Sequence, residues 1–176
     1  LTVTATGGNI TDFGEVNVGG TTSLTTGNNR SILLDNIANT LVGNITLSVT
    51  CSGCTENFSN VTLYNTADIN LNEFDVTNNL IVTGDTINFG RTAGTTSATN
   101  LTATATSLAI GNVITQSNAL DISGYNTLTA NATGNILLAD DTNDFATVSA
   151  NGFNVDLHDK DSIRLAASTV TGTLDV

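Results

Sequence analysis

The chain has 176 residues and a formal net charge of −12, from 16 acidic and four basic residues. Arg30, Arg91, Lys160 and Arg164 are too scattered to form the cationic patch that phosphate binding requires, which excludes nucleic acid as a partner. No stretch is apolar and long enough to cross a bilayer, so we expect no membrane insertion. Hydrophobic residues make up 39% and aromatic residues 5%, which predicts a thin aliphatic core.

Short alternating segments follow one another along the whole chain. Apolar and polar residues alternate in residues 1–6, 15–18, 68–71, 120–123, 162–165 and 173–176. This period of two predicts half-buried strands, and the frequent Val, Ile and Thr suit a pleated surface. Gly and Asn between these segments, for example in 7–9, 27–29 and 132–135, predict tight corners. No window has helical spacing with caps, so we expect almost no helix.

A long repeat fixes the apolar positions and leaves the residues between them free to vary. Seven apolar residues recur 104 positions later (136 − 32 = 104): Ile10, Val16, Val18, Leu24, Ile32, Leu33 and Leu34 match Ile114, Leu120, Ile122, Leu128, Ile136, Leu137 and Leu138. Seven more recur 94 positions later (176 − 82 = 94): Val61, Leu63, Ile69, Leu71, Val76, Leu80 and Val82 match Val155, Leu157, Ile163, Leu165, Val170, Leu174 and Val176. We interpret the matched residues as inward-facing positions of a stacked architecture.

An antiparallel sandwich and a parallel β-helix both fit short strands with Gly/Asn corners. A sandwich has no reason to repeat its interior at a fixed offset, whereas stacked coils do. We therefore predict one continuous β-solenoid over 1–176, made of two related copies (about 1–100 and 101–176). At roughly 20–25 residues a coil, the chain would form about seven to nine coils.

The change of offset from 104 to 94 places ten extra residues in the first copy. Residues 51–60 read as a loop of that length, and solenoids expel insertions at corners. Cys51 and Cys54 lie in this loop as C-x-x-C. A disulfide between them is our prediction, with free thiols and a metal or redox role as alternatives.

The strings at 1–11, 119–124 and 167–174 resemble the repeats of filamentous haemagglutinin-like proteins, which are very large bacterial surface and secreted adhesins. The resemblance implies a right-handed parallel β-helix, export, and an adhesive or structural role. The secretion domain of that family carries Asn-Pro motifs, and this chain has no Pro. The resemblance therefore supplies no functional residue.

The acidic run at 139–144 is the best candidate for a cation site. Calcium binds carboxylate and carbonyl oxygens, which makes Asp140, Asp141 and Asp144 possible ligands. The run matches neither an EF-hand loop nor the Gly-rich calcium nonapeptide, so we favour solvated corner residues and expect no cofactor.

Catalytic machinery is not apparent. His158 is the single histidine and no G-x-S-x-G motif is present, so we predict that the chain is not an enzyme. The Thr runs at 2–6 and 102–106 suggest an ice-binding ladder, but we expect the coils between them not to continue it.

These observations predict an extracellular or cell-surface structural protein: a β-solenoid segment of an adhesin, or a subunit that self-associates end to end through open strand edges. A host surface or glycan is a possible partner. The alternative is a carbohydrate-binding or polysaccharide-cleaving β-helix of the phage-fibre type.

Overall fold

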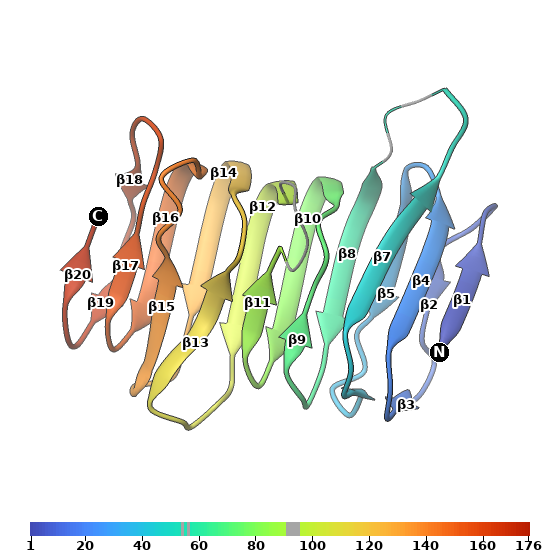
Figure 1. Cartoon of the computed structure of the whole chain (residues 1–176), viewed down its shortest axis with the longest axis horizontal. Coiled ribbons are helices and arrows are strands. Elements are labelled where there is room, and N and C mark those ends of the chain that lie inside the picture. Colours follow the sequence, from blue (N-terminus) through green and yellow to red (C-terminus); the bar gives the residue numbers. More distant parts are fainter. Residues whose placement is uncertain (54, 56, 91–95) are drawn as a thin grey trace.

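The computed structural model is a parallel β-solenoid of about eight turns, with the two termini at opposite ends of the rod (Figure 1). It describes residues 1–53, 55, 57–90 and 96–176. Every strand pairing in the described chain is parallel, and none of the described residues lies in a helix. The predicted fold class is therefore confirmed, and no described helix could span a lipid bilayer.

Three strands build each of the first coils. Sheet A contains β1 (Thr2–Ala5), β4 (Thr22–Gly27) and β7 (Ile45–Thr50). Two shorter strands, β3 (Asn17–Val18) and β6 (Thr40–Leu41), form sheet C. The third side belongs to the long sheet B, which begins with β2 (Ile10–Thr11) and β5 (Arg30–Leu34). Each of these coils thus contributes one strand to each of three sheets, and the cross-section of the rod is three-sided here.

Two strands a coil suffice further along. Sheet B continues through β8 (Phe58–Tyr64), β10 (Asp75–Gly84), β12 (Thr96–Ala105), β14 (Leu120–Thr129), β16 (Asp144–Gly152), β18 (Arg164–Leu165) and β19 (Thr169–Val170). Sheet D faces it and contains β9 (Ile69–Asn70), β11 (Ile87–Phe89), β13 (Gly111–Gln116), β15 (Gly134–Leu138), β17 (Val155–Leu157) and β20 (Leu174–Asp175).

The change of cross-section occurs between β7 and β9. Ile45 at the start of β7 forms a parallel bridge to Leu71, which follows β9. At the next residue, the side chain of Asn72 takes the place of a neighbouring strand: its Oδ1 accepts from the Leu47 N–H (2.7 Å) and its Nδ2 donates to the Leu47 carbonyl (3.0 Å). The amide thereby satisfies backbone groups that a neighbouring strand would otherwise pair, and sheet A ends there.

One apolar core runs along the rod, from Ile10 to Leu157. The inward column of sheet D shows its regularity, because each residue pairs with the next: Ile69, Ile87, Ile114, Ile136, Val155 and Leu174. The intervals range from 18 residues (87 − 69) to 27 residues (114 − 87), so coil length varies while the inward position stays fixed.

Not every matched position faces the core. Leu33 and Leu137 point outward between buried neighbours in β5 and β15, although the repeat predicted that they face inward. Three further matched positions near the C-terminus are exposed. Leu165, Leu174 and Val176 are 43%, 48% and 55% exposed, although the repeat predicted that they face inward. They lie in the last coil of the chain, where each strand has a neighbour on one side only. Packing from one side leaves part of each side chain in solvent.

The 104-residue match does not relate equivalent coils. Ile32 lies in β5 of sheet B, whereas its match Ile136 lies in β15 of sheet D. In the register of sheet B, the residue stacked above Ile32 is Asn126 after four coils and Val148 after five. Ile136 lies between these two in the sequence and is equivalent to neither. Both Ile residues are buried because strands of every sheet alternate inward and outward. The division into two copies remains an interpretation of the sequence.

The predicted insertion is shorter than ten residues. Residues 58–60 belong to β8, and Phe58 is buried with its ring perpendicular to that of Phe74 (centroids 5.8 Å apart). The connection between β7 and β8 therefore covers 51–57. Phe13, by contrast, is fully exposed to solvent at a corner and does not pack in the core.

Candidate functional site

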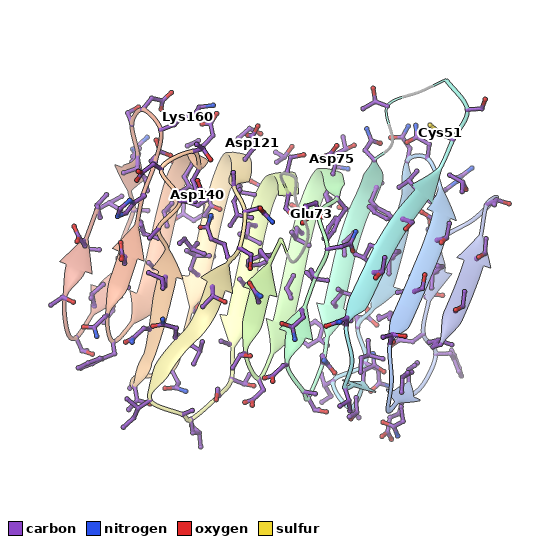
Figure 2. All side chains as sticks on the ribbon, viewed as in Figure 1. Cys51, Glu73, Asp75, Asp121, Asp140 and Lys160 are labelled. Atoms are coloured by element: carbon purple, nitrogen blue, oxygen red, sulfur yellow. The ribbon has the colours of Figure 1, made fainter. Side chains whose placement is uncertain are left out.

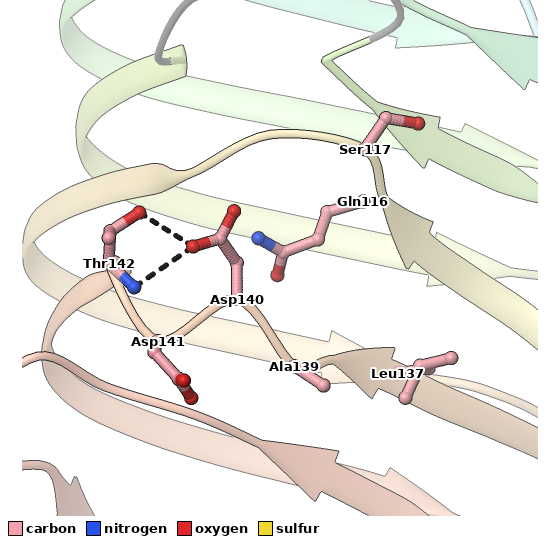
Figure 3. Close-up of a pocket in the computed structure, with 7 residues that line it drawn as sticks. All are labelled: Gln116, Ser117, Leu137, Ala139, Asp140, Asp141 and Thr142. Carbon is pink, nitrogen blue, oxygen red and sulfur yellow. Dashed lines mark hydrogen bonds between the residues drawn. The ribbon is translucent and has the colours of Figure 1, made fainter.

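The three calcium candidates do not converge. Asp140 Oδ1 accepts hydrogen bonds from the Thr142 N–H (2.9 Å) and hydroxyl (2.6 Å), which close a local turn (Figure 3). These bonds hold the pKa of Asp140 below its usual value. The Asp141 side chain points away from that of Asp140 (Figure 3). Asp144 pairs instead with Lys160 Nζ at 2.5 Å. Among the described residues, no group of three or more potential ligands is arranged to hold a metal ion.

His158 links two consecutive coils. Its Nδ1 lies 2.5 Å from Asp141 Oδ1, and its Nε2 lies 3.3 Å from Asp156 Oδ1. The hydrogen bond to Asp141 raises the pKa of His158, and the charges of Asp156 and Asp175 act in the same direction. An imidazole held between carboxylates favours its protonated form. Protonated His158 therefore holds two consecutive coils together through its contact with Asp141.

Carboxylates collect on one long edge of the rod. Asp75, Ser97, Asp121 and Asp144 are successive partners in sheet B, so their side chains form a column across four coils. Figure 2 shows Asp75, Asp121 and Lys160 along the same edge. The Ser97 hydroxyl donates to Asp75 (2.7 Å), and Lys160 neutralises part of the charge at Asp144, which raises the pKa of that lysine. Ser97 thus separates two of the like charges in this column, and Lys160 compensates a third.

At the corners, buried asparagine side chains replace the backbone hydrogen bonds between strands. Asn143 is fully buried, and its Oδ1 accepts from the Leu120 N–H (2.9 Å) while its Nδ2 donates to the carbonyls of Leu138 and His158 (3.1 Å each). Asn65 pairs in the same way with both backbone groups of Leu41 (2.7 and 3.0 Å). Such buried backbone groups require partners, and the strands have already turned away at these positions. The high Asn content therefore serves the fold.

Beyond a bulge, the strands of sheet B present an uncharged outer surface. Register shifts in β10, β12 and β14 separate the acidic strand starts from the second halves of these strands. There the outward residues form three rows across five coils, which we call the neutral face. Its positions are Asn60, Asn79, Asn100, Tyr125 and Thr147; Thr62, Ile81, Thr102, Thr127 and Ser149; and Tyr64, Thr83, Thr104, Thr129 and Asn151. Ser149 is buried and donates to the Ala167 carbonyl (2.6 Å), so the next coil covers this end of the second row.

A glycine positions the aromatic residue of this face. A Cβ at Gly124 would lie 2.5 Å from the Thr99 carbonyl oxygen and 2.7 Å from Asn100 Oδ1, so only glycine fits. The close approach lets Asn100 Oδ1 accept from the Tyr125 N–H (3.0 Å). Tyr125 is held on the outer surface and is 45% exposed.

Sequence reasoning missed the neutral face. The Thr runs extend into neighbouring coils, since Thr104 lies between Thr83 and Thr129 and Thr4 pairs with Thr25. They do not continue through all the coils between 2–6 and 102–106, as expected, because Thr83 pairs next with Tyr64 and Thr25 with Ser48. Coils of unequal length hide this partial alignment in the sequence. A usable signal was the pattern Thr-x-Thr in 102–104 and 127–129.

The disulfide prediction remains open. Cys51 directly follows β7, at the start of the connection to β8, but Cys54 lies outside the described residues. The bond between Cys51 and Cys54 therefore stays a prediction from their spacing.

Comparisons with known proteins identify the sequence type. No curated protein and no solved structure matches the chain. A family model described as repeats of unknown function (DUF5649) matches residues 1–48 and 88–151. The two segments cover 112 of the 176 residues (48 + 64) and take in both the three-sided and the two-sided coils. The chain therefore belongs to the DUF5649 family of repeats.

Proposed function

We propose that the chain is a structural segment of an extracellular or cell-surface protein, and that it works as a rod that holds an adhesive surface away from its attachment point. The observation that carries this proposal is the single apolar core through all coils. At about 4.8 Å a coil, eight coils extend about 40 Å. A core of this shape gives length and stiffness, while the outer faces vary freely.

End-to-end association is part of the proposal. In the described chain, β20 pairs only with β17 and β1 pairs only with β4, so each has one open edge. An open parallel edge accepts another strand, either from the same polypeptide or from a second copy. The exposed Leu174 and Val176 would be buried by such a coil.

Nothing in this function requires catalysis, and we propose none. The carboxylates at 140–144 are each engaged in their own local contact, and glycoside hydrolysis needs two carboxyl groups that face each other across a substrate.

Electron microscopy of the purified chain tests the rod and its assembly. We expect short rods at low concentration and end-to-end filaments as the concentration rises. A spherical particle would contradict the rod, and single rods at every concentration would contradict end-to-end assembly. Protease treatment of intact producing cells tests location: loss of the chain without lysis is expected, and full protection would overturn the surface assignment.

A further inference from the structure

We infer that the neutral face is a binding surface for an uncharged polysaccharide that lies along the rod. This inference rests on the proposed surface function and adds the ligand class and the residues that contact the ligand. The face spans β8, β10, β12, β14 and β16, which are adjacent in sheet B (Figure 1). It therefore offers a continuous surface about 20 Å long, at about 4.8 Å a coil.

Charge selects the class of ligand. None of the fifteen positions of the neutral face is charged, although the chain carries 20 charged residues (16 + 4). The acidic column through Asp75, Asp121 and Asp144 lies on the other side of the bulge in the same strands. An anionic polymer would be repelled by the net charge of −12, and a cationic one would gain more at the acidic column than on the neutral face.

The face has hydrogen-bonding groups to spare. The hydroxyls of Thr83, Thr102, Thr104, Thr127 and Thr129 make no hydrogen bond to another described residue, and these side chains are half-buried between their neighbours. Each can donate one hydrogen bond and accept two. Strand pairing fixes these side chains in rows, so little conformational freedom is lost when a ligand with regularly spaced hydroxyls binds.

Two tyrosines provide apolar contact at separate places on this face. Tyr64 lies in the first of its coils and Tyr125 in the fourth, and they belong to different outer rows. A tyrosine ring supplies a rigid apolar surface with a polar end, which suits the alternating C–H and O–H groups of a sugar ring. The bond from the Tyr125 N–H to Asn100 fixes the backbone that carries one of these rings on the outer surface.

The mixture of side-chain lengths favours a polysaccharide over ice. An ice surface requires a flat lattice of identical groups, whereas one row here runs Thr62, Ile81, Thr102, Thr127 and Ser149. Long amides and tyrosines flank the threonines on the remaining rows. Varied donors and acceptors with aromatic contacts are typical of adaptable polar recognition.

Glycan-array screening followed by titration tests the inference. The array carries neutral hexasaccharides of glucose, mannose, galactose and N-acetylglucosamine, together with alginate and heparin fragments as anionic comparisons. We expect binding to at least one neutral oligomer. Tyr125→Ala and Thr104→Lys should each weaken that binding about tenfold or more.

The matched control is Thr46→Lys, which places the same charge on an outward, half-buried position of sheet A. It should leave binding unchanged, and thermal melting should show all three variants folded. Absence of binding to every neutral oligomer, binding only to anionic fragments, or equal loss in Thr46→Lys would overturn the inference. Rods and surface exposure would still stand in that case, because microscopy and proteolysis measure them independently.

Discussion

Replacement of Asn143 by alanine should destabilise the protein more than any other single amide substitution in the described rod. The side chain is fully buried at the corner between β15 and β16. Its removal leaves the Leu120 N–H and the carbonyls of Leu138 and His158 without their side-chain partner. Gln116 also loses its two bonds to Asn143, but that side chain is half-buried and keeps its bond to the Asn118 carbonyl (3.0 Å).

The expected cost follows from these bonds. The Leu120 N–H is left buried and unsatisfied, which costs about 1–3 kcal/mol, and each of the two lost bonds to carbonyls costs about 1 kcal/mol more, since the Leu138 carbonyl still accepts from the His158 N–H (2.9 Å). We therefore expect Asn143→Ala to lower the free energy of unfolding by about 4 kcal/mol. For a chain of this size, such a loss lowers the Tm by about 12 °C.

Urea unfolding followed by circular dichroism measures the loss, and hydrogen exchange at the Leu120 amide locates it. The matched control is Asn112→Ala, which removes an exposed asparagine from the same rod and should change stability by less than about 0.5 kcal/mol. Equal stability of the Asn143→Ala and Asn112→Ala variants, with the Leu120 N–H still protected from exchange, would refute the role of buried asparagines as hydrogen-bond partners of the backbone.

Three further predictions test packing and charge. Because the hydrogen bond to Asp141 raises the pKa of His158, NMR titration should give that histidine a pKa above 6.5. The contribution of protonated His158 to folding stability is complete below pH 6.5 and is lost as the pH rises through the folded pKa. This pH dependence should be absent in His158→Ala. An unshifted pKa of His158 would contradict the contact between His158 and Asp141. Phe58→Ala should cost about 3–5 kcal/mol in urea unfolding, and a neutral result would mean a loose core. Gly124→Ala should cost about 1–3 kcal/mol in the same assay, because its Cβ meets the Thr99 carbonyl; wild-type stability would show that the bulge tolerates a side chain.

The sequence was sufficient to predict parallel coils and most inward positions. Alternation at a period of two determines which side chain faces the core, whichever sheet a strand joins. This explains why Ile32 and Ile136 are both buried although they belong to different sheets. The same insensitivity made the coil boundaries unpredictable, because a shift between sheets leaves the alternation intact.

The corners required three-dimensional information. Asn65, Asn72 and Asn143 have no pattern in common in the sequence, yet each pairs with backbone groups of the preceding coil. Their roles depend on which residue lies one coil below, and coils of 18 to 27 residues do not reveal that partner. The neutral face was overlooked for the same reason.

Cysteine cross-linking between neighbouring coils tests the stacked architecture most directly. Thr83 and Thr104 are partners in adjacent strands, so their Cα atoms lie about 4.8 Å apart, within the range that a disulfide spans. Thr83 and Thr129 are two coils apart, at about 9.6 Å. Peptide mass spectrometry after mild oxidation should find the cross-link in the Thr83→Cys/Thr104→Cys variant and not in the Thr83→Cys/Thr129→Cys variant. The reverse result would contradict the parallel register on which the solenoid depends.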